Sequence, residues 1–143
     1  MTAAGVLLTG TTAVAVAGRA LLIEGEPGSG KSSLALALID RGASLIGDDG
    51  VWLTLEGGRV MAKPPPCITG LLEVRGVGLI RLPAVSAPVG LILRLDTAAP
   101  RLPDPLDHRE LLGRTVPLLL LQQNAAQLAL RAEHALALHG LAG

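Results

Sequence analysis

The sequence predicts an α/β fold built around a phosphate-binding loop, with a mixed sheet, antiparallel additions and two main helices. Residues 25–32 read Gly-Glu-Pro-Gly-Ser-Gly-Lys-Ser, which matches the pattern Gly-x-x-x-x-Gly-Lys-Ser/Thr. A short apolar run at 20–23 precedes this pattern and an apolar segment at 33–39 follows it, as a strand–loop–helix unit requires. Elsewhere, short apolar runs outnumber helical segments, so we expect strands to form most of the fold.

Composition limits the classes of protein to which this chain can belong. Its 143 residues are half hydrophobic, and Trp52 is the only aromatic residue. We expect a single domain over residues 1–143, with a core packed from aliphatic side chains. The formal net charge is zero, and Lys and Arg form no run. Because a nucleic-acid-binding surface needs a basic cluster, nucleic acid is not an expected partner.

The single cysteine and the N-terminus bear on the cellular setting. Cys67 has no second cysteine with which to form an internal disulfide, and no Cys/His spacing indicates zinc. We expect Cys67 to fill apolar space, because no base can be identified that would make it a nucleophile. The N-terminus lacks a basic region, and no apolar run is long enough to cross a bilayer. These features predict a reduced, cytoplasmic setting and no membrane partner.

The first elements are predicted to lead into and out of the phosphate loop. Gly10 and Gly18 separate three apolar runs that predict a small antiparallel lead-in, at residues 6–8, 13–16 and 19–24. The helix that starts near Lys31 is expected to end at Arg41. Gly42 then stands where a left-handed C-terminal cap favours glycine.

The middle of the chain is predicted to be a series of short strands. A strand at 44–46 leads directly to an Asp-Asp pair. Two further runs at 51–56 and 59–62 flank Gly-Gly at 57–58, which indicates a two-residue hairpin turn. Three prolines at 64–66 then end regular pairing.

The rest of the chain adds strands and a final helix. Charged residues interrupt an apolar, glycine-punctuated stretch at 70–80, which indicates a site, since a plain core strand does not tolerate charges cheaply. We expect a strand at 89–95, then a Pro-rich loop and a short polar helix at 108–112. A last buried strand at 116–121 precedes Asn124, which is expected to N-cap an Ala/Leu-rich helix.

The phosphate loop carries the clearest chemistry in the sequence. Its glycines allow successive backbone N–H groups to turn inward onto phosphate oxygens, and Lys31 can reach the β- and γ-phosphates. The hydroxyl of Ser32 is a ligand for magnesium. We therefore expect a nucleotide triphosphate to bind to Gly25, Glu26, Pro27, Gly28, Ser29, Gly30, Lys31 and Ser32. The alternative is a Gly-rich turn without a ligand, which the flanking strand and helix disfavour.

Asp48 and Asp49 follow the first strand beyond the loop helix. Phosphoryl transfer uses a carboxylate near magnesium and a carboxylate that takes the proton of the acceptor hydroxyl. If strand geometry continues, the two side chains point to opposite faces and only one can face the magnesium, whereas a loop can present both. The alternative is an Asp-Asp-Gly turn that merely ends the strand.

Three other charged residues are candidates on weaker grounds. Glu73 and Arg75 are two residues apart and share a face of an extended segment. The carboxylate can hold magnesium there and the guanidinium can neutralise a transferring group, or the two can form a plain surface ion pair. Arg109 is a candidate cationic clamp, although its charged neighbours at 107–110 favour a solvated helix face.

Three separated blocks resemble the catalytic domain of HPr kinase/phosphorylase, a bacterial enzyme that phosphorylates a serine of the phosphocarrier protein HPr. They are the phosphate loop, the segment Leu-Ile-Asp-Arg-Gly-Ala-Ser-Leu-Ile-Gly-Asp-Asp at 38–49, and Leu-Leu-Glu-Val-Arg-Gly-Val-Gly-Leu-Ile at 71–80. The last block is similar to the family signature Leu-Glu-Ile/Val-Arg-Gly-x-Gly, which ordinary phosphate-loop proteins lack. The resemblance covers most of residues 10–123. It implies the phosphate-loop fold shared by HPr kinase and PEP carboxykinase.

The resemblance also implies cofactors and partners. ATP and magnesium would be used, and an HPr-like phosphocarrier of the phosphotransferase system would accept the phosphoryl group on a serine. The chain is similar to the short alphaproteobacterial forms that lack the family's N-terminal domain. Because the family forms rings of subunits, a homo-oligomer is expected.

Residue roles in the nucleotide site follow from the matching motifs. By resemblance, Lys31 and the loop backbone would bind phosphates, while Ser32 and Glu73 would bind magnesium. Asp48 would lie beside them as a second carboxylate near the metal.

The catalytic roles follow in the same way. By resemblance, Asp49 would accept the proton of the acceptor hydroxyl. Arg75 belongs to the family's catalytic signature, and Arg109 matches a later catalytic arginine of the family.

The chain departs from the family pattern in two places. The family carries His-Gly-Thr ahead of the phosphate loop, where this chain has Thr-Gly-Thr at 9–11. The family also has a Lys and Gly-Arg-Asn, tied to dephosphorylation, where this chain reads Val-Pro-Leu-Leu-Leu-Leu-Gln-Gln-Asn at 116–124. We therefore expect a kinase with weak or absent phosphorylase activity. A small-molecule kinase and a nucleotide-binding regulatory module without turnover remain the alternatives.

Overall fold

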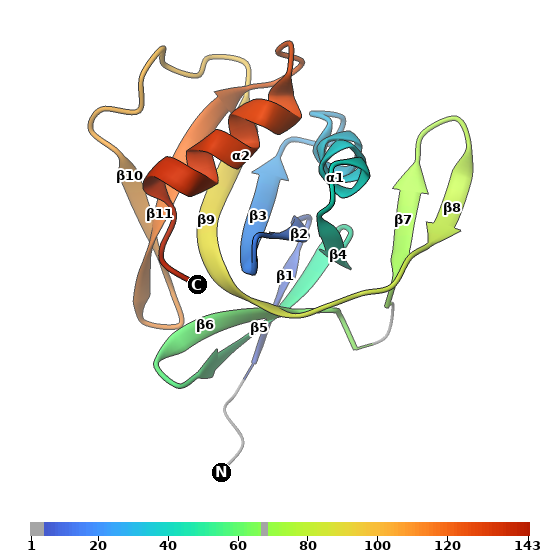
Figure 1. Ribbon diagram of the computed structural model, residues 1–143, viewed down its shortest axis with the longest axis horizontal. Helices are drawn as coiled ribbons and strands as arrows, with labels where there is room; N and C mark the ends of the chain where they lie inside the picture. Colours follow the sequence, from blue (N-terminus) through green and yellow to red (C-terminus); the bar gives the residue numbers. More distant parts are fainter. Residues whose placement is uncertain (1–4, 67–68) are drawn as a thin grey trace.

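The computed structural model describes residues 5–66 and 69–143. Within these residues, a nine-stranded mixed sheet curls around the core, a two-stranded hairpin stands apart from it, and two helices lie beside its central strands (Figure 1). This arrangement agrees with the predicted α/β class. No helix in the described ranges is both long and apolar enough to cross a membrane. The expectation for Cys67 lies outside the described residues.

The large sheet contains nine strands from along the chain. They are β1 (Val6–Thr9), β2 (Thr12–Val16), β3 (Arg19–Gly25), β4 (Ser44–Gly47), β5 (Gly50–Glu56), β6 (Arg59–Lys63), β9 (Ala87–Asp96), β10 (Asp107–Leu111) and β11 (Arg114–Gln122). Their order is β1-β5-β6-β9-β3-β2-β4, and β11 also pairs with β9 and carries β10 on its other side. The remaining elements are the hairpin strands β7 (Leu71–Val74) and β8 (Gly78–Arg81), and the helices α1 (Lys31–Asp40) and α2 (Leu128–His139).

Strand direction brings three loops to one edge of the sheet. β9 pairs in parallel with both β3 and β11. β2 is antiparallel to β3, and β4 is antiparallel to β2, so β4 runs in the same direction as β3. The segments that follow β3, β4 and β11 therefore emerge together. In open α/β sheets, ligands bind at this carboxyl edge.

The two faces of the central strands pack into two separate cores. Leu21 and Ile23 of β3 point into the core that α1 and α2 cover, whereas Leu22 points into a core between the central strands and β5 and β6. Helix α1 contributes Leu34 and Leu38 to the first core. Because both faces of β3 are buried, the strand that leads into the phosphate loop is held from two sides.

Several predicted boundaries are confirmed. Helix α1 ends at Asp40, and Gly42 follows with φ +110°, in the left-handed region that favours glycine. The backbone N–H of Gly42 donates to the carbonyl of Ile39. Gly57 and Gly58 both have positive φ in the hairpin between β5 and β6, as the Gly-Gly signal predicts.

Two predicted elements are wrong and a third is only partly right. Residues 107–111 form strand β10 rather than a polar helix, because pairing with the buried strand β11 outweighs the local charge pattern. Leu111 is the buried end of that strand. The predicted lead-in holds for β2 and β3, but β1 pairs with β5. Helix α2 begins at Leu128, with Gln127 rather than Asn124 at its N-cap.

Replacing Leu93 by Ala should destabilise the protein by about 2–5 kcal/mol, because the side chain is fully buried in the core beneath the helices and would leave a cavity. The free energy of unfolding can be measured by urea denaturation. Leu138→Ala is the matched control, since Leu138 is 77% exposed on α2 and its truncation should change stability by about 0.5 kcal/mol or less. Equal effects of the two substitutions would contradict the assigned core.

Candidate active site

The phosphate loop connects the carboxyl end of β3 to the first turn of α1. Gly28 (φ +83°) and Gly30 (φ +101°) adopt left-handed conformations, and a Cβ at either position would meet open space. Backbone conformation, rather than crowding, therefore favours glycine at both. At Gly25 the reason is contact, because a Cβ there would lie 2.5 Å from Oγ of the buried Ser29. Ser29 thus fills the space beside Gly25, whereas Gly28 and Gly30 face open space and line the cavity.

The Lys31 side chain folds back over this loop. Its ammonium Nζ donates a hydrogen bond to the carbonyl oxygen of Gly25, with 2.9 Å between the two atoms. The partner is neutral, so the positive charge of Lys31 is not cancelled by a carboxylate there. Lys31 also opens the helix, where unpaired backbone N–H groups favour an anion. The geometry suits a phosphate group.

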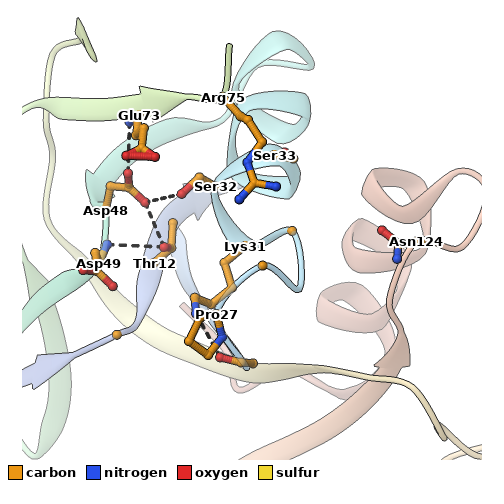
Figure 2. A pocket seen from close by; sticks show the side chains of 14 residues that line it. Thr12, Pro27, Lys31, Ser32, Ser33, Asp48, Asp49, Glu73, Arg75 and Asn124 are labelled. Atoms are coloured by element: carbon orange, nitrogen blue, oxygen red, sulfur yellow. Dashed lines mark hydrogen bonds between the residues drawn. The ribbon is translucent and has the colours of Figure 1, made fainter. Parts of the chain in front are cut away.

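The carboxylate of Asp48 joins three different elements (Figure 2). Its Oδ1 accepts hydrogen bonds from Oγ of Ser32 at 2.7 Å and from Oγ1 of Thr12 at 3.0 Å. Its Oδ2 accepts a third from the backbone N–H of Glu73 at 3.1 Å. These donors lie at the start of β2, in the first turn of α1 and in β7. The phosphate loop, the sheet edge and the hairpin therefore meet at one carboxylate.

Asp49 lies beside Asp48 but in a different conformation. Its φ of +59° is left-handed, so the alternation of a strand is broken and both carboxylates line the same cavity. The backbone N–H of Asp49 donates to Oγ1 of Thr12 at 3.4 Å, and its carbonyl accepts from Gly10 at 3.1 Å. Within the described residues, no group donates a hydrogen bond to its carboxylate, which is exposed. The loop alternative considered from the sequence, with both side chains presented, is the one that forms.

Glu73 and Arg75 reach the same cavity from the β7–β8 hairpin (Figure 2). Arg75 lies in the turn after β7, and its guanidinium points toward the start of α1. In the part of the chain that the structure describes, the two side chains form no ion pair with each other. The cavity has a volume of about 600 Å³. Its walls therefore combine one lysine, one arginine and three carboxylates.

The sequence reasoning missed several residues that line this cavity. Asn124 is the clearest, since it was expected to cap α2 and instead lies across the cavity from Lys31 (Figure 2). Its φ of +60° places it in a left-handed turn three residues before the helix cap. The available signal was a run of polar amides at the end of a buried strand. Thr12 was missed too, and only its place opposite Asp48 identifies it.

Arg109 is not among the described residues that line the cavity. Its guanidinium donates instead to Oε2 of Glu24, at the end of β3, at 2.5 Å. This hydrogen bond raises the pKa of Arg109, while burial acts in the opposite direction. Arg94 lies 3.7 Å from the other oxygen of Glu24. The structure thus places Arg109 beneath the phosphate loop, apart from the other predicted residues.

The residues present fit a nucleotide with magnesium. Magnesium prefers oxygen ligands and keeps several waters, so one or two protein carboxylates together with substrate phosphates complete its shell. Ser32 and Asp48 bring two oxygens together, and Glu73 supplies a carboxylate nearby. No cluster of three or more His, Cys, Asp or Glu side chains in the described ranges could hold a metal by itself. A site that depends on phosphate oxygens agrees with that finding.

Comparisons with known proteins point to one family. The family model for the HPr serine kinase C-terminal domain matches residues 2–86. An HPr kinase/phosphorylase of Cupriavidus necator is 34% identical over 125 residues, covering 78% of this chain and 39% of that protein. One from Clostridium tetani is 44% identical over 72 residues, covering 50% of this chain and 24% of that protein. The chain thus spans less than half the length of these relatives.

A solved structure agrees over nearly the whole chain. The Hpr(Ser) kinase/phosphatase from Coxiella burnetii superposes with a TM-score of 0.84 at 29% identity, covering 94% of this chain and 90% of that one. The phosphate loop, the acidic pair and the hairpin signature all lie within residues 2–86, the range that the family model matches. The chain therefore belongs to the HPr serine kinase C-terminal domain family.

Proposed function

We propose that this chain is a magnesium- and ATP-dependent kinase that phosphorylates a serine of an HPr-like phosphocarrier protein. The observation that supports it most directly is the meeting of Ser32, Asp48 and Glu73 at the open side of a phosphate loop, with Asp49 beside them. A phosphoryl donor and a proton acceptor would then face the same 600 Å³ cavity. The names of the relatives supply the class of acceptor.

The phosphate loop and Lys31 bind the nucleotide in this proposal. The backbone N–H groups of the loop face the β- and γ-phosphates, and the lysine ammonium leaves the Gly25 carbonyl to contact them. Ser32, Asp48 and Glu73 would hold magnesium, whose positive charge would offset the negative charge of the phosphates.

The two aspartates differ in the hydrogen bonds that their carboxylates accept, and this difference assigns them different roles. Asp48 accepts three, so it holds Thr12, Ser32 and the hairpin together beside the place where magnesium would bind. Asp49 accepts none from the described residues, so its carboxylate is free to take a proton. A general base must reach the hydroxyl that it deprotonates, and Asp49 is exposed at the cavity. We therefore assign the proton acceptor to Asp49.

The proposed step is an in-line transfer. The acceptor serine oxygen forms a new bond to the γ-phosphorus while the bond from that phosphorus to the β,γ-bridging oxygen breaks. The serine proton passes to the carboxylate of Asp49, and the leaving electron pair stays on ADP. Arg75 lines the cavity, its guanidinium points from the hairpin toward the start of α1, and there it would offset the charge of the transferring group.

We further propose that dephosphorylation is weak or absent. Thr9 stands at the end of β1, where the family carries a histidine, so the imidazole available to relatives is missing here. Residues 116–124, which form most of β11 and the two residues after it, contain no charged side chain. Reverse transfer would need groups that position phosphate or activate it for removal, and neither segment provides one.

Incubation of the purified protein with magnesium, labelled ATP and the HPr homologue from the same genome should place label on a serine. Mass spectrometry of the acceptor identifies the modified residue. Binding of ATP without transfer would instead indicate a regulatory module, and label on a small metabolite would indicate a different kinase. Either result would contradict the proposal.

Asp49→Asn should lower the transfer rate by about 10²–10⁴-fold, because the amide cannot take the proton. Asn tolerates the left-handed conformation at this position, so the loop should keep its shape. Nucleotide affinity, measured by titration, should remain within about threefold of the wild-type value. Asp40→Asn, at the exposed end of α1, is the control. A wild-type transfer rate in Asp49→Asn would remove that residue from its role.

Lys31→Ala should weaken nucleotide binding itself by about tenfold or more, since a charge-assisted contact to phosphate is lost. Lys63→Ala is a matched control, because Lys63 is the chain's other lysine and pairs with Glu56. Calorimetric titration with ATP gives both affinities. Unchanged affinity in Lys31→Ala would contradict the loop assignment.

A further inference from the structure

The β7–β8 hairpin is attached to the protein through one of its two faces. Leu72 and Ile80 are cross-strand partners, and both pack against the core beneath the helices. Leu72 is completely buried. The hairpin pairs with no strand of the large sheet in the described residues, and it projects from the body beside α1 (Figure 1). Its second face is therefore free of the main sheet.

That second face carries the cavity residue Glu73 together with an exposed leucine. Side chains alternate between the faces of a hairpin, and Glu73 is the direct cross-strand partner of Leu79. Leu79 is 68% exposed, and Val77 in the adjoining turn is 76% exposed. A cross-strand partner lies within about 5.5 Å at Cβ, so Leu79 stands at the edge of the candidate active site.

Large apolar side chains in these positions need a reason. Hairpin turns favour small and polar residues, so a valine at 77 gives no local advantage. Arg81 shares the face of Leu79 by strand alternation. Arg81 forms no ion pair with a described residue. The surface combines an apolar centre with one available positive charge.

We propose that this hairpin surface, formed by Val77, Leu79 and Arg81, is the docking site for the acceptor protein. The inference rests on the proposed function and adds to it the chemistry of the partner's surface. The partner would present apolar side chains, flanked by a carboxylate, next to the hydroxyl that is phosphorylated. Buried apolar anchors with a charged rim are typical of protein interfaces.

Continuity with the cavity favours the acceptor protein as the occupant. Glu73 and Arg75 belong to the same hairpin and line the cavity, so a protein that rests on Leu79 has its nearest side chains at the reaction centre. A nucleotide held by the phosphate loop needs no contact with Leu79. An acceptor bound to the strand pair that carries Glu73 would also have its serine hydroxyl held close to Asp49. Holding the two groups together before the reaction lowers the entropic part of the barrier.

The test is the acceptor dependence of Leu79→Ser. Its KM for the HPr homologue should rise about tenfold, since truncating one interface leucine removes about 1.4 kcal/mol of binding. The kcat at saturating acceptor should stay within about twofold. Arg81→Glu should raise KM as well, because it places a negative charge opposite the partner's carboxylate. Leu138→Ser, another exposed leucine, on α2, should leave KM unchanged. Thermal unfolding checks that each variant is folded.

A direct titration of unlabelled acceptor onto the protein separates this proposal from the kinase proposal. If Leu79→Ser weakens acceptor binding, this result supports the docking surface, even if no phosphoryl transfer occurs. Transfer by the wild type with an unchanged KM in Leu79→Ser overturns the docking surface and leaves the kinase proposal intact. A loss of self-association in Leu79→Ser, seen by sedimentation with unchanged acceptor binding, also overturns it, in favour of a second copy of this chain.

Discussion

The carboxylate of Asp48 is the contact on which the candidate site depends. It ties a threonine of β2, a serine of α1 and the backbone of β7 to one point. Hydrogen bonds to a charged group contribute about 1.5–3 kcal/mol each, so the junction resists separation of its parts. Apart from this contact, the hairpin is held by the packing of its apolar face. The hydrogen bond from the backbone N–H of Glu73 to Asp48 therefore fixes the position of Glu73 relative to the phosphate loop. A site assembled from segments far apart in the chain needs such a shared partner.

Sheet direction makes that contact possible. Between β3 and β4 the chain returns through α1, and β2 lies between the two strands and is antiparallel to both. β4 therefore runs in the same direction as β3 and ends at the same edge of the sheet. Gly47 then allows a very close turn, since a Cβ there would lie 2.2 Å from the carbonyl oxygen of Gly50. The left-handed backbone at Asp49 completes the turn. Two adjacent carboxylates can therefore serve one cavity with different hydrogen-bonding states.

The other end of the phosphate loop is stabilised differently. Glu24 is mostly buried at the end of β3, where an unpaired carboxylate would be costly. Arg109, on β10, donates a hydrogen bond to Oε2 of this carboxylate. Its Oε1 accepts no hydrogen bond from the described residues, but Arg94, the cross-strand partner of Glu24 on β9, lies 3.7 Å away and adds a second positive charge. The arginine that sequence comparison suggested for catalysis is thus occupied with the base of the loop. The two cores pack against opposite faces of β3, so the loop starts from a rigid position.

Local sequence alone determined the phosphate loop, its flanking strand and helix, the Gly-Gly hairpin and the C-terminal end of α1 at Gly42. These depend on backbone preferences of neighbouring residues, which a short stretch of sequence contains. The acidic pair was identifiable from its place directly after a short strand, and the signature stretch from the charges that interrupt its apolar run.

Tertiary structure decided what these segments do together. Pairing with β11 turned the polar segment at 107–111 into a strand, and a left-handed turn moved Asn124 from a helix cap to the cavity wall. Strand order brought Thr12 to Asp48, and register placed Leu79 opposite Glu73. Each of these outcomes depends on contacts between residues distant in the chain, and local propensity carries no information about such contacts.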